Sequence, residues 1–194
     1  MTTNSARLLF FAGSARRGSH NKKLARLGAM IAEANGIPAT FLDLADYPMP
    51  IYHGDLEAES GLPENALKLR AVMEEHTGIF IASPEYNASI TPLLKNSLDW
   101  VSRPHDGVPT QVFKTRVFAL GSASPGGMGG LRSLNTVRTV LTLGLGALVL
   151  PEQFAVPRAV DAFGEDGHLT NKDAQENFKA IIQKLARAAH VLHG

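Results

Sequence analysis

The chain has 194 residues, of which 44% are hydrophobic and 19% charged, and these values are typical of one ordinary globular domain. It contains no cysteine, which excludes disulfides, thiolate metal sites and cysteine nucleophiles. The 19 lysines and arginines nearly balance the 18 acidic residues, and no basic stripe points to nucleic acid as a partner.

The N-terminal residues lead directly into an apolar run and lack the charged leader of a secretory signal. The longest apolar stretch, residues 141–151, is interrupted by Thr142, Gly144 and Gly146 and is too short to span a bilayer. We therefore expect a cytoplasmic protein with no membrane contact, folded as a single domain over residues 1–194.

In the first half of the chain, short apolar runs alternate with amphipathic segments. Leucine and isoleucine recur at helical spacing between Asn21 and Asn35, and Gly36 ends that segment. The pattern predicts strands over 8–12, 39–43 and 79–82, and helices over 21–35 and 64–75.

The second half continues this alternation. Thr91 before Pro92 indicates a helix start, because a hydroxyl N-cap and a proline at the first helical position both favour one. Thr170 and Asp173 resemble a capping box before the last helix, and we expect Pro151 to close the fifth strand. The pattern predicts strands over 116–120 and 147–150, and helices over 92–102, 131–143 and around 178–192.

Strands that are continuously apolar and alternate with helices indicate a parallel sheet covered on both faces. Five such strands in a chain of this length fit an α/β, flavodoxin-like three-layer sandwich with strand order 2-1-3-4-5. In open sheets of this kind, ligands bind outside the carboxyl ends of the strands, where the strand order reverses. The loops after the first, third and fourth strands are therefore the expected site.

The first of these loops, residues 13–21, joins a buried strand to a helix N-terminus, where free N–H groups and the helix dipole favour an anion. Arg16 adds a permanent charge suited to phosphate. The loop matches neither a dinucleotide fingerprint nor a Walker A sequence, which favours a monophosphate such as FMN. The alternative is an ordinary turn, since serine and glycine are common in turns. The candidate ligands are Gly13, Ser14, Arg16, Ser19 and Asn21.

The pattern Ser14-x-Arg16-x-x-Ser19 resembles the phosphate loop of the NAD(P)H-dependent FMN reductases, which include bacterial quinone and chromate reductases. Residues 83–87, Ser-Pro-Glu-Tyr-Asn, together with 92–103, resemble the second signature of that family. The resemblance covers essentially the whole chain. It implies bound FMN, NAD(P)H as co-substrate, a small-molecule electron acceptor and a homodimer or homotetramer, with no side chain acting as a nucleophile.

The same resemblance implies that Pro84, Glu85, Tyr86 and Asn87 line the flavin ring, chiefly through main-chain atoms. It also places the glycine-rich loop 121–130 beside the ring, with Ser122 and Ser124 as the favoured contacts. The Glu85 side chain itself could be a pH-active group, but a solvated loop carboxylate is the favoured interpretation. For the loop at 121–130 the alternative is a merely flexible connection.

The helix after the second loop is unusually rich in polar and aromatic side chains. In similar proteins this segment helps to build a dimer interface beside the flavin, and tryptophan and arginine are common interface anchors. The alternative is that Trp100 packs in the core. The seven histidines are scattered and form no zinc-type spacing, so we expect no metal site. The residues concerned on the helix are Lys95, Asn96, Asp99, Trp100 and Arg103.

Two other functions are compatible with a flavodoxin-like chain. A flavodoxin-type electron carrier would not oxidise NAD(P)H by itself, but such carriers are strongly acidic and this chain has a net charge of +1. An interaction or sensor module would bind no flavin at all. The sequence decides neither the final acceptor, nor NADH against NADPH, nor the role of residues 151–168.

Overall fold

The computed structural model of the protein describes residues 6–193. Its centre is a five-stranded sheet with the order β2-β1-β3-β4-β5, in which every neighbouring pair is parallel. The strands are β1 (Leu8–Ala12), β2 (Ala39–Asp43), β3 (Gly78–Ala82), β4 (Val117–Ala123) and β5 (Leu148–Val156). The predicted sheet order is confirmed.

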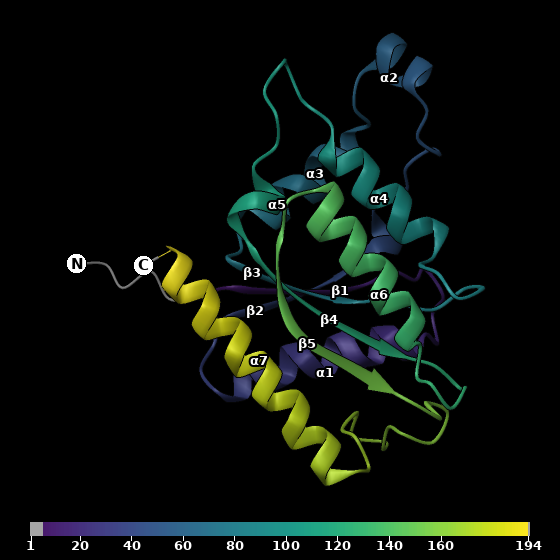
Figure 1. Ribbon diagram of the computed structural model, residues 1–194, viewed down its shortest axis with the longest axis vertical. Coiled ribbons are helices and arrows are strands. Elements are labelled where there is room, and N and C mark those ends of the chain that lie inside the picture. The colour runs from purple at the N-terminus through teal and green to yellow at the C-terminus, as the bar shows by residue number, and fades with distance from the viewer. Residues whose placement is uncertain (1–5, 194) are drawn as a thin grey trace.

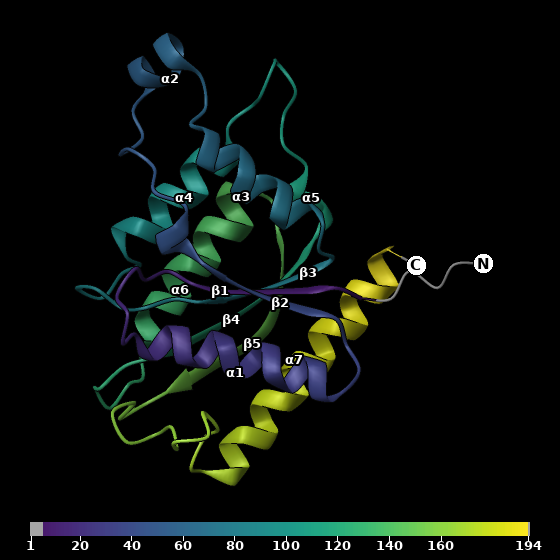
Figure 2. The ribbon, with the colours of Figure 1, turned by 180° about the vertical axis from the view of Figure 1, so that it is seen from behind.

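Helices cover both faces of the sheet, as Figures 1 and 2 show. On one face lie α1 (His20–Ala34) and α7 (Lys172–His193), and on the other lie α3 (Glu64–Glu74), α4 (Pro92–Ser102), α5 (Val112–Thr115) and α6 (Leu131–Thr139). Successive residues of β1 point to opposite faces, so Phe10 joins the core under α1 and α7 while Phe11 joins the core on the other side. The chain is therefore a three-layer α/β sandwich.

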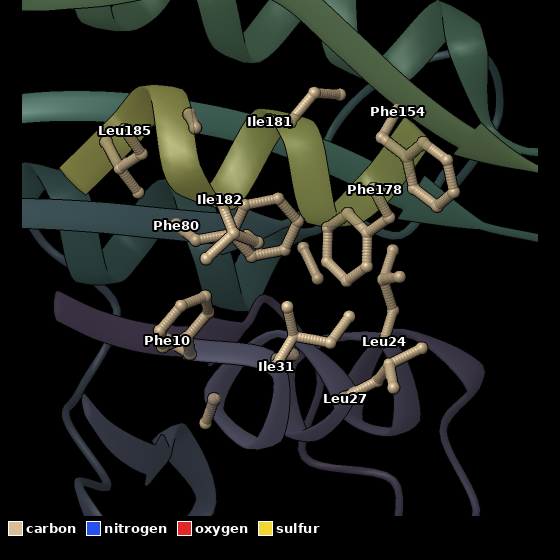
Figure 3. Packing of buried hydrophobic residues seen from close by; sticks show 14 of the residues in the cluster. Phe10, Leu24, Leu27, Ile31, Phe80, Phe154, Phe178, Ile181, Ile182 and Leu185 are labelled. Carbon is tan, nitrogen blue, oxygen red and sulfur yellow. The ribbon is translucent and has the colours of Figure 1, made fainter. Parts of the chain in front are cut away.

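Aromatic rings fill the core between the sheet and the helix pair α1 and α7 (Figure 3). Phe178 of α7 stacks on Phe154 with ring centroids 4.7 Å apart and meets Phe80 edge-on at 5.3 Å. Gly121 of β4 packs against the same cluster, and a Cβ atom there would come within 2.5 Å of the Phe80 ring. This dense packing fixes the strands whose carboxyl ends carry the loops described below.

The fifth strand does not end at Pro151, so that prediction is wrong. Strand β5 runs on to Val156, and the register against β4 shifts between Phe118 and Leu120, whose partners are Val149 and Gln153. Pro151 therefore lies in a bulge on an edge strand, where its missing N–H removes no ladder hydrogen bond. The strand thus reaches the same end of the sheet as the predicted site.

Other local predictions also differ from the structure. The helix predicted over 131–143 is α-helical only to Thr139 and continues as a wider π-helical turn over Val140–Gly144. Asn171, not Thr170, caps α7, because its Oδ1 accepts a 3.0 Å hydrogen bond from the Ala174 amide. A short helix α2 (Gly54–Ser60) was not predicted, because none of its residues is buried and no apolar period exists. No helix within residues 6–193 is long and apolar enough to cross a membrane.

Candidate cofactor site

Three loops enclose a hollow of about 290 Å³ beyond the carboxyl ends of β1, β3 and β4. In Figure 1 this is the end of the sheet toward which the β5 arrow points. The hollow is lined by Ser14, Arg16, Ser19, His20, Asn21, Pro84, Glu85, Tyr86, Ala123, Ser124 and Pro125. Of the predicted ligands, Gly13, Asn87 and Ser122 do not line it.

The start of α1 forms one wall of the hollow. Ser19 is the N-cap, and its hydroxyl accepts from the Lys22 amide, while the preceding amides of the first turn have no partner inside the helix. Arg16 is exposed at the rim and forms no ion pair within residues 6–193, whereas Lys22 is buried and pairs with Asp43 at 2.7 Å. The wall therefore presents N–H donors and one unpaired cation.

His20, the first residue of α1, adds a ring to this wall. Its Nδ1 is buried and has no hydrogen-bond partner in the described part of the chain. Burial lowers the pKa of His20, and the charges of Arg16 and Lys23 lower it further. The wall thus combines a neutral imidazole with a cation, hydroxyls and backbone amides. Such a set of hydrogen-bond donors suits an anion, so these residues fit a phosphate group.

Asn21 holds the first loop against β4. Its Nδ2 donates to the Ala123 carbonyl at 2.8 Å, and its Oδ1 accepts from the Ala123 amide at 2.9 Å. Because both polar atoms are occupied, the side chain supports the hollow, and only its backbone N–H is left to face a ligand.

Gly13 makes room for α4 and not for a ligand. A Cβ atom at Gly13 would lie 2.8 Å from the Cβ of Leu94, and the Thr91 hydroxyl donates to the Gly13 carbonyl at 2.6 Å. The N-cap of α4 is therefore joined to the end of β1. The prediction that Gly13 faces the ligand missed this contact, because its two residues are 78 positions apart in the sequence and no local pattern connects them.

The second loop is a tight turn that follows β3. Tyr86 and Ser89 exchange two 3.0 Å backbone hydrogen bonds, and Asn87 and Ala88 between them have φ values of 49° and 65°. These angles define a type I′ turn, which asparagine tolerates well. Asn87 is exposed at the tip, outside the hollow, while Pro84 is buried and Tyr86 is 55% exposed.

Glu85 is not a solvated loop carboxylate, so that interpretation is wrong. Its side chain is only 9% exposed and forms an ion pair with Arg132 at the start of α6. One carboxylate oxygen accepts from Arg132 Nε at 2.7 Å, and the other accepts from the Arg132 backbone amide at 3.1 Å. The second loop is thereby joined to the helix that follows the third loop.

The third loop is held by hydrogen bonds on two sides. Ser122 is fully buried and its hydroxyl donates to Gly129 at 2.7 Å, so it shapes the loop from behind. Ser124 borders the hollow. Its amide donates to Val156, the last residue of β5, at 3.1 Å, and its carbonyl accepts from the Ala159 amide beyond β5 at 3.0 Å. The segment after β5 therefore supports this loop, which answers one question that the sequence left open.

The polar side chains of α4 contact a projecting segment, residues 47–60, which we call the arm. The Trp100 indole is fully buried and donates to Pro50 at 2.8 Å, while Asn96 bonds both Pro50 and the Tyr52 amide. Arg103 pairs with Glu57 at 2.9 Å. Trp100 is thus a core residue, and Lys95 pairs with Asp99 along the exposed side of the helix.

Larger hollows also lie away from the carboxyl ends of the strands. One of about 530 Å³ lies between the ends of α1 and α7 and is mainly apolar, and one of about 580 Å³ lies beside α3. They lie away from the strand ends at which open parallel sheets bind their ligands. Within the described residues, no group of histidine and carboxylate side chains could hold a metal ion.

A parallel sheet of order 2-1-3-4-5 with helices on both faces defines the flavodoxin-like class of α/β proteins, and the hollow lies at the switch point of this sheet. Within this class, the sequence pattern of the NADPH-dependent FMN reductases matches residues 6–161. The chain belongs to that family.

Individual relatives match over nearly their whole length. An NAD(P)H:quinone oxidoreductase of Solanum tuberosum is 33% identical over 186 residues, covering 94% of this chain and 92% of the relative. An NAD(P)H-dependent FMN reductase of Pseudomonas aeruginosa is 32% identical, with 99% and 100% coverage. Among solved structures, the flavoenzyme NAD(P)H:(acceptor) oxidoreductase FerB of Paracoccus denitrificans superposes with a TM-score of 0.79 at 25% identity, covering 96% of this chain and 98% of that one.

Proposed function

We propose that this protein binds FMN in the hollow at the carboxyl ends of β1, β3 and β4, and uses it to transfer electrons from NAD(P)H to a small acceptor such as a quinone or a free flavin. The observation that carries the proposal is the meeting of unpaired α1 amides, the free Arg16 cation and an exposed loop surface in one hollow. Membership of the FMN reductase family supports the same assignment.

The phosphate end of the cofactor would be held by the first loop. Arg16 supplies charge, Ser19 and Ser14 supply hydroxyls, and the backbone amides of residues 20 and 21 supply the helix N-terminus. Because Asn21 is fixed to Ala123, these amides are already oriented before a ligand arrives. The loop therefore binds with little further ordering.

The ring end would lie along the second and third loops, against the main chain of residues 84–86 and beside Ser124. When bound, FMN supplies the redox chemistry, since its ring accepts a hydride from the reduced nicotinamide and passes electrons on to the acceptor. The protein contributes orientation. No side chain in the hollow has to act as a nucleophile.

The hollow, at about 290 Å³, is slightly smaller than the roughly 300–1,000 Å³ typical of small-molecule sites. Part of a flavin-sized ligand would therefore remain outside it, next to the exposed Tyr86. An open ring face of this kind admits a nicotinamide and then a second substrate in turn, and it favours a broad choice of flat acceptors.

The test is an anaerobic visible spectrum of the purified protein after reconstitution with FMN, repeated with NADH and then NADPH. The proposal expects loss of the oxidised-flavin absorbance with at least one nicotinamide, followed by steady NAD(P)H oxidation once a quinone is added. A flavin that stays oxidised would favour an electron carrier. A protein that cannot be reconstituted would favour a module that binds no flavin.

We also propose that residues 1–194 form one domain that assembles as a homodimer or homotetramer in the cytoplasm. One sheet drawn from residues 8–156 and the closing helix α7 support a single domain, and Ile51, 84% exposed on the arm, supports a contact there. Light scattering after size-exclusion chromatography measures the assembly, limited proteolysis tests the domain, and cell fractionation tests the compartment.

A further inference from the structure

Glu85 and Arg132 join the second loop to the start of α6 by an ion pair beside the hollow. The Glu85 carboxylate accepts from the Arg132 side chain at 2.7 Å and from the Arg132 backbone amide at 3.1 Å, and a second guanidinium nitrogen is also in contact. The Glu85 side chain is 9% exposed, whereas that of Arg132 is 56% exposed. The carboxylate is therefore the buried partner of the pair, and the guanidinium is the exposed one.

Neutral hydrogen bonds at the same junction show how closely the two segments approach. The Ser133 hydroxyl lies 2.9 Å from the Ser83 carbonyl, and the Ser83 amide donates to Gly121 at 2.8 Å. A Cβ atom at Gly130 would lie 2.9 Å from Ser122 and 3.7 Å from Glu85. Within residues 6–193, Glu85 with Arg132 is the only ion pair that connects the second loop to this junction.

We propose that the Glu85–Arg132 pair is a positioning device, which fixes the main chain of residues 84–86 for the flavin ring and neutralises a carboxylate that would otherwise stand uncompensated beside it. This inference rests on the proposed function, because it takes the hollow as the flavin site. Neither residue is assigned a catalytic role, since both act through the loop backbone and through their net charge.

The first consequence concerns ring binding. A loop held in its bound conformation loses less conformational freedom when the ligand arrives. Glu85→Gln and Arg132→Gln should each weaken the binding of riboflavin, which has the ring but no phosphate, by about tenfold, the lower end of the range for one charge-assisted hydrogen bond. Each should weaken FMN by the same factor, because the phosphate loop is unchanged.

The second consequence concerns the charge beside the ring. Reduction makes the flavin more negative, so an unpaired carboxylate disfavours the reduced form and an unpaired cation favours it. Arg132→Gln should therefore lower the midpoint potential of bound FMN, while Glu85→Gln should raise it. A double variant carrying both substitutions should return the potential toward that of the wild type while keeping the weak binding of the ring.

The experiment measures FMN and riboflavin affinities by fluorescence titration, and the midpoint potential by anaerobic dye equilibration, for the wild type and these variants. Glu64→Gln, which breaks the exposed Glu64–Lys68 pair on α3, is the matched control and should change neither quantity. Arg132→Lys, which keeps the charge, should retain the wild-type potential and serves as a further variant if a neutral one fails to fold.

Opposite shifts in potential, together with equal losses of FMN and riboflavin affinity, would support the inference. Unchanged affinities, or potentials that move in the same direction in both single variants, would overturn it. If the wild type itself binds no FMN, the proposed function fails. If the wild type binds FMN and the variants behave like it, only the role of the pair fails.

Discussion

The hollow and the arm are both rich in polar side chains, but the hydrogen-bonding groups around the arm are paired, whereas several of those in the hollow are not. Where the arm meets α4, Trp100 and Asn96 donate to the Pro50 carbonyl, and Arg103 at the end of the helix pairs with Glu57. At the hollow, Arg16 has no ion-pair partner in the described residues, and His20 has a buried nitrogen without a hydrogen bond. Unpaired donors, and not polar composition, distinguish a ligand site from a structural contact.

The hollow also relies on structural bonds behind its lining. Asn21 clamps Ala123, Ser122 holds Gly129 and Glu85 is neutralised by Arg132. These bonds occupy the side chains that face into the protein and leave the ligand-facing donors free. This division of roles is the basis of a preorganised site.

The largest expected effect lies where α4 packs against the arm. Trp100→Ala should lower the free energy of unfolding by about 3–5 kcal/mol, because it removes a fully buried ring from the contact with Tyr52. Urea denaturation monitored by circular dichroism measures this loss. FMN affinity of the folded fraction should stay at the wild-type value. An equal loss of affinity would mean that the two regions are not independent.

Arg16→Ala should leave the fold intact and weaken FMN by roughly ten- to a hundredfold, the value of a hydrogen bond to a charged group. The reason is that Arg16 is the free cation of the hollow. Flavin fluorescence quenching measures the affinity. Arg17→Ala is the matched control, because Arg17 is exposed in the same loop and does not line the hollow. Equal effects of the two substitutions would contradict the assignment.

A pH dependence of moderate size should come from His76, which lies outside both regions. Its Nδ1 lies 2.7 Å from the Val72 carbonyl and its Nε2 lies 2.9 Å from the Thr40 hydroxyl, and burial lowers its pKa. The folded state thus prefers the neutral ring. The contribution of neutral His76 to the free energy of unfolding should be fully present above about pH 6.5, the ordinary histidine pKa. It should fall as the pH decreases below that value.

Urea midpoints measured between neutral and mildly acidic pH test this prediction in the wild type and in His76→Gln. The variant should be less stable at neutral pH but should lose less stability on acidification. Burial also lowers the pKa of His20, so a residual slope is expected in the variant, and saturating FMN should change that slope. Parallel curves of stability against pH for the wild type and His76→Gln would show that His76 does not cause the pH dependence.

The smallest effect is expected at the edge of the arm. Glu57→Gln removes the charge that pairs with Arg103, and this hydrogen-bonded cation holds the pKa of Glu57 below its usual range. The Arg103 side chain is 41% exposed, so solvent screens the pair. Glu57→Gln should melt at a slightly lower temperature than the wild type in scanning calorimetry, and its FMN affinity should be unchanged.

Much of the fold could be predicted because the sheet is apolar and repetitive. The strand that ends at Gly13 and the helix that begins at Pro92 are marked by local residues, and both lie as predicted. The arm could not be predicted, because α2 buries no residue and its sequence therefore shows no helical periodicity of apolar residues. The bulge at Pro151 depends on the strand's place at the sheet edge, which local sequence does not encode.

The same distinction applies to the site. Most of its lining could be predicted, because the loops after parallel strands must meet at one end of the sheet. The partners of Glu85 and Asn21 could not, since they lie 47 and 102 residues away in sequence. A local pattern identifies a polar residue but does not say whether another segment already occupies it.

The most direct test is a crystal structure of the protein grown with excess FMN. The proposed binding mode requires a phosphate within hydrogen-bonding distance of Arg16 and the first amides of α1, and a ring along residues 84–86. FMN bound in a different cavity, or a hollow closed by side chains at saturating FMN, would contradict it.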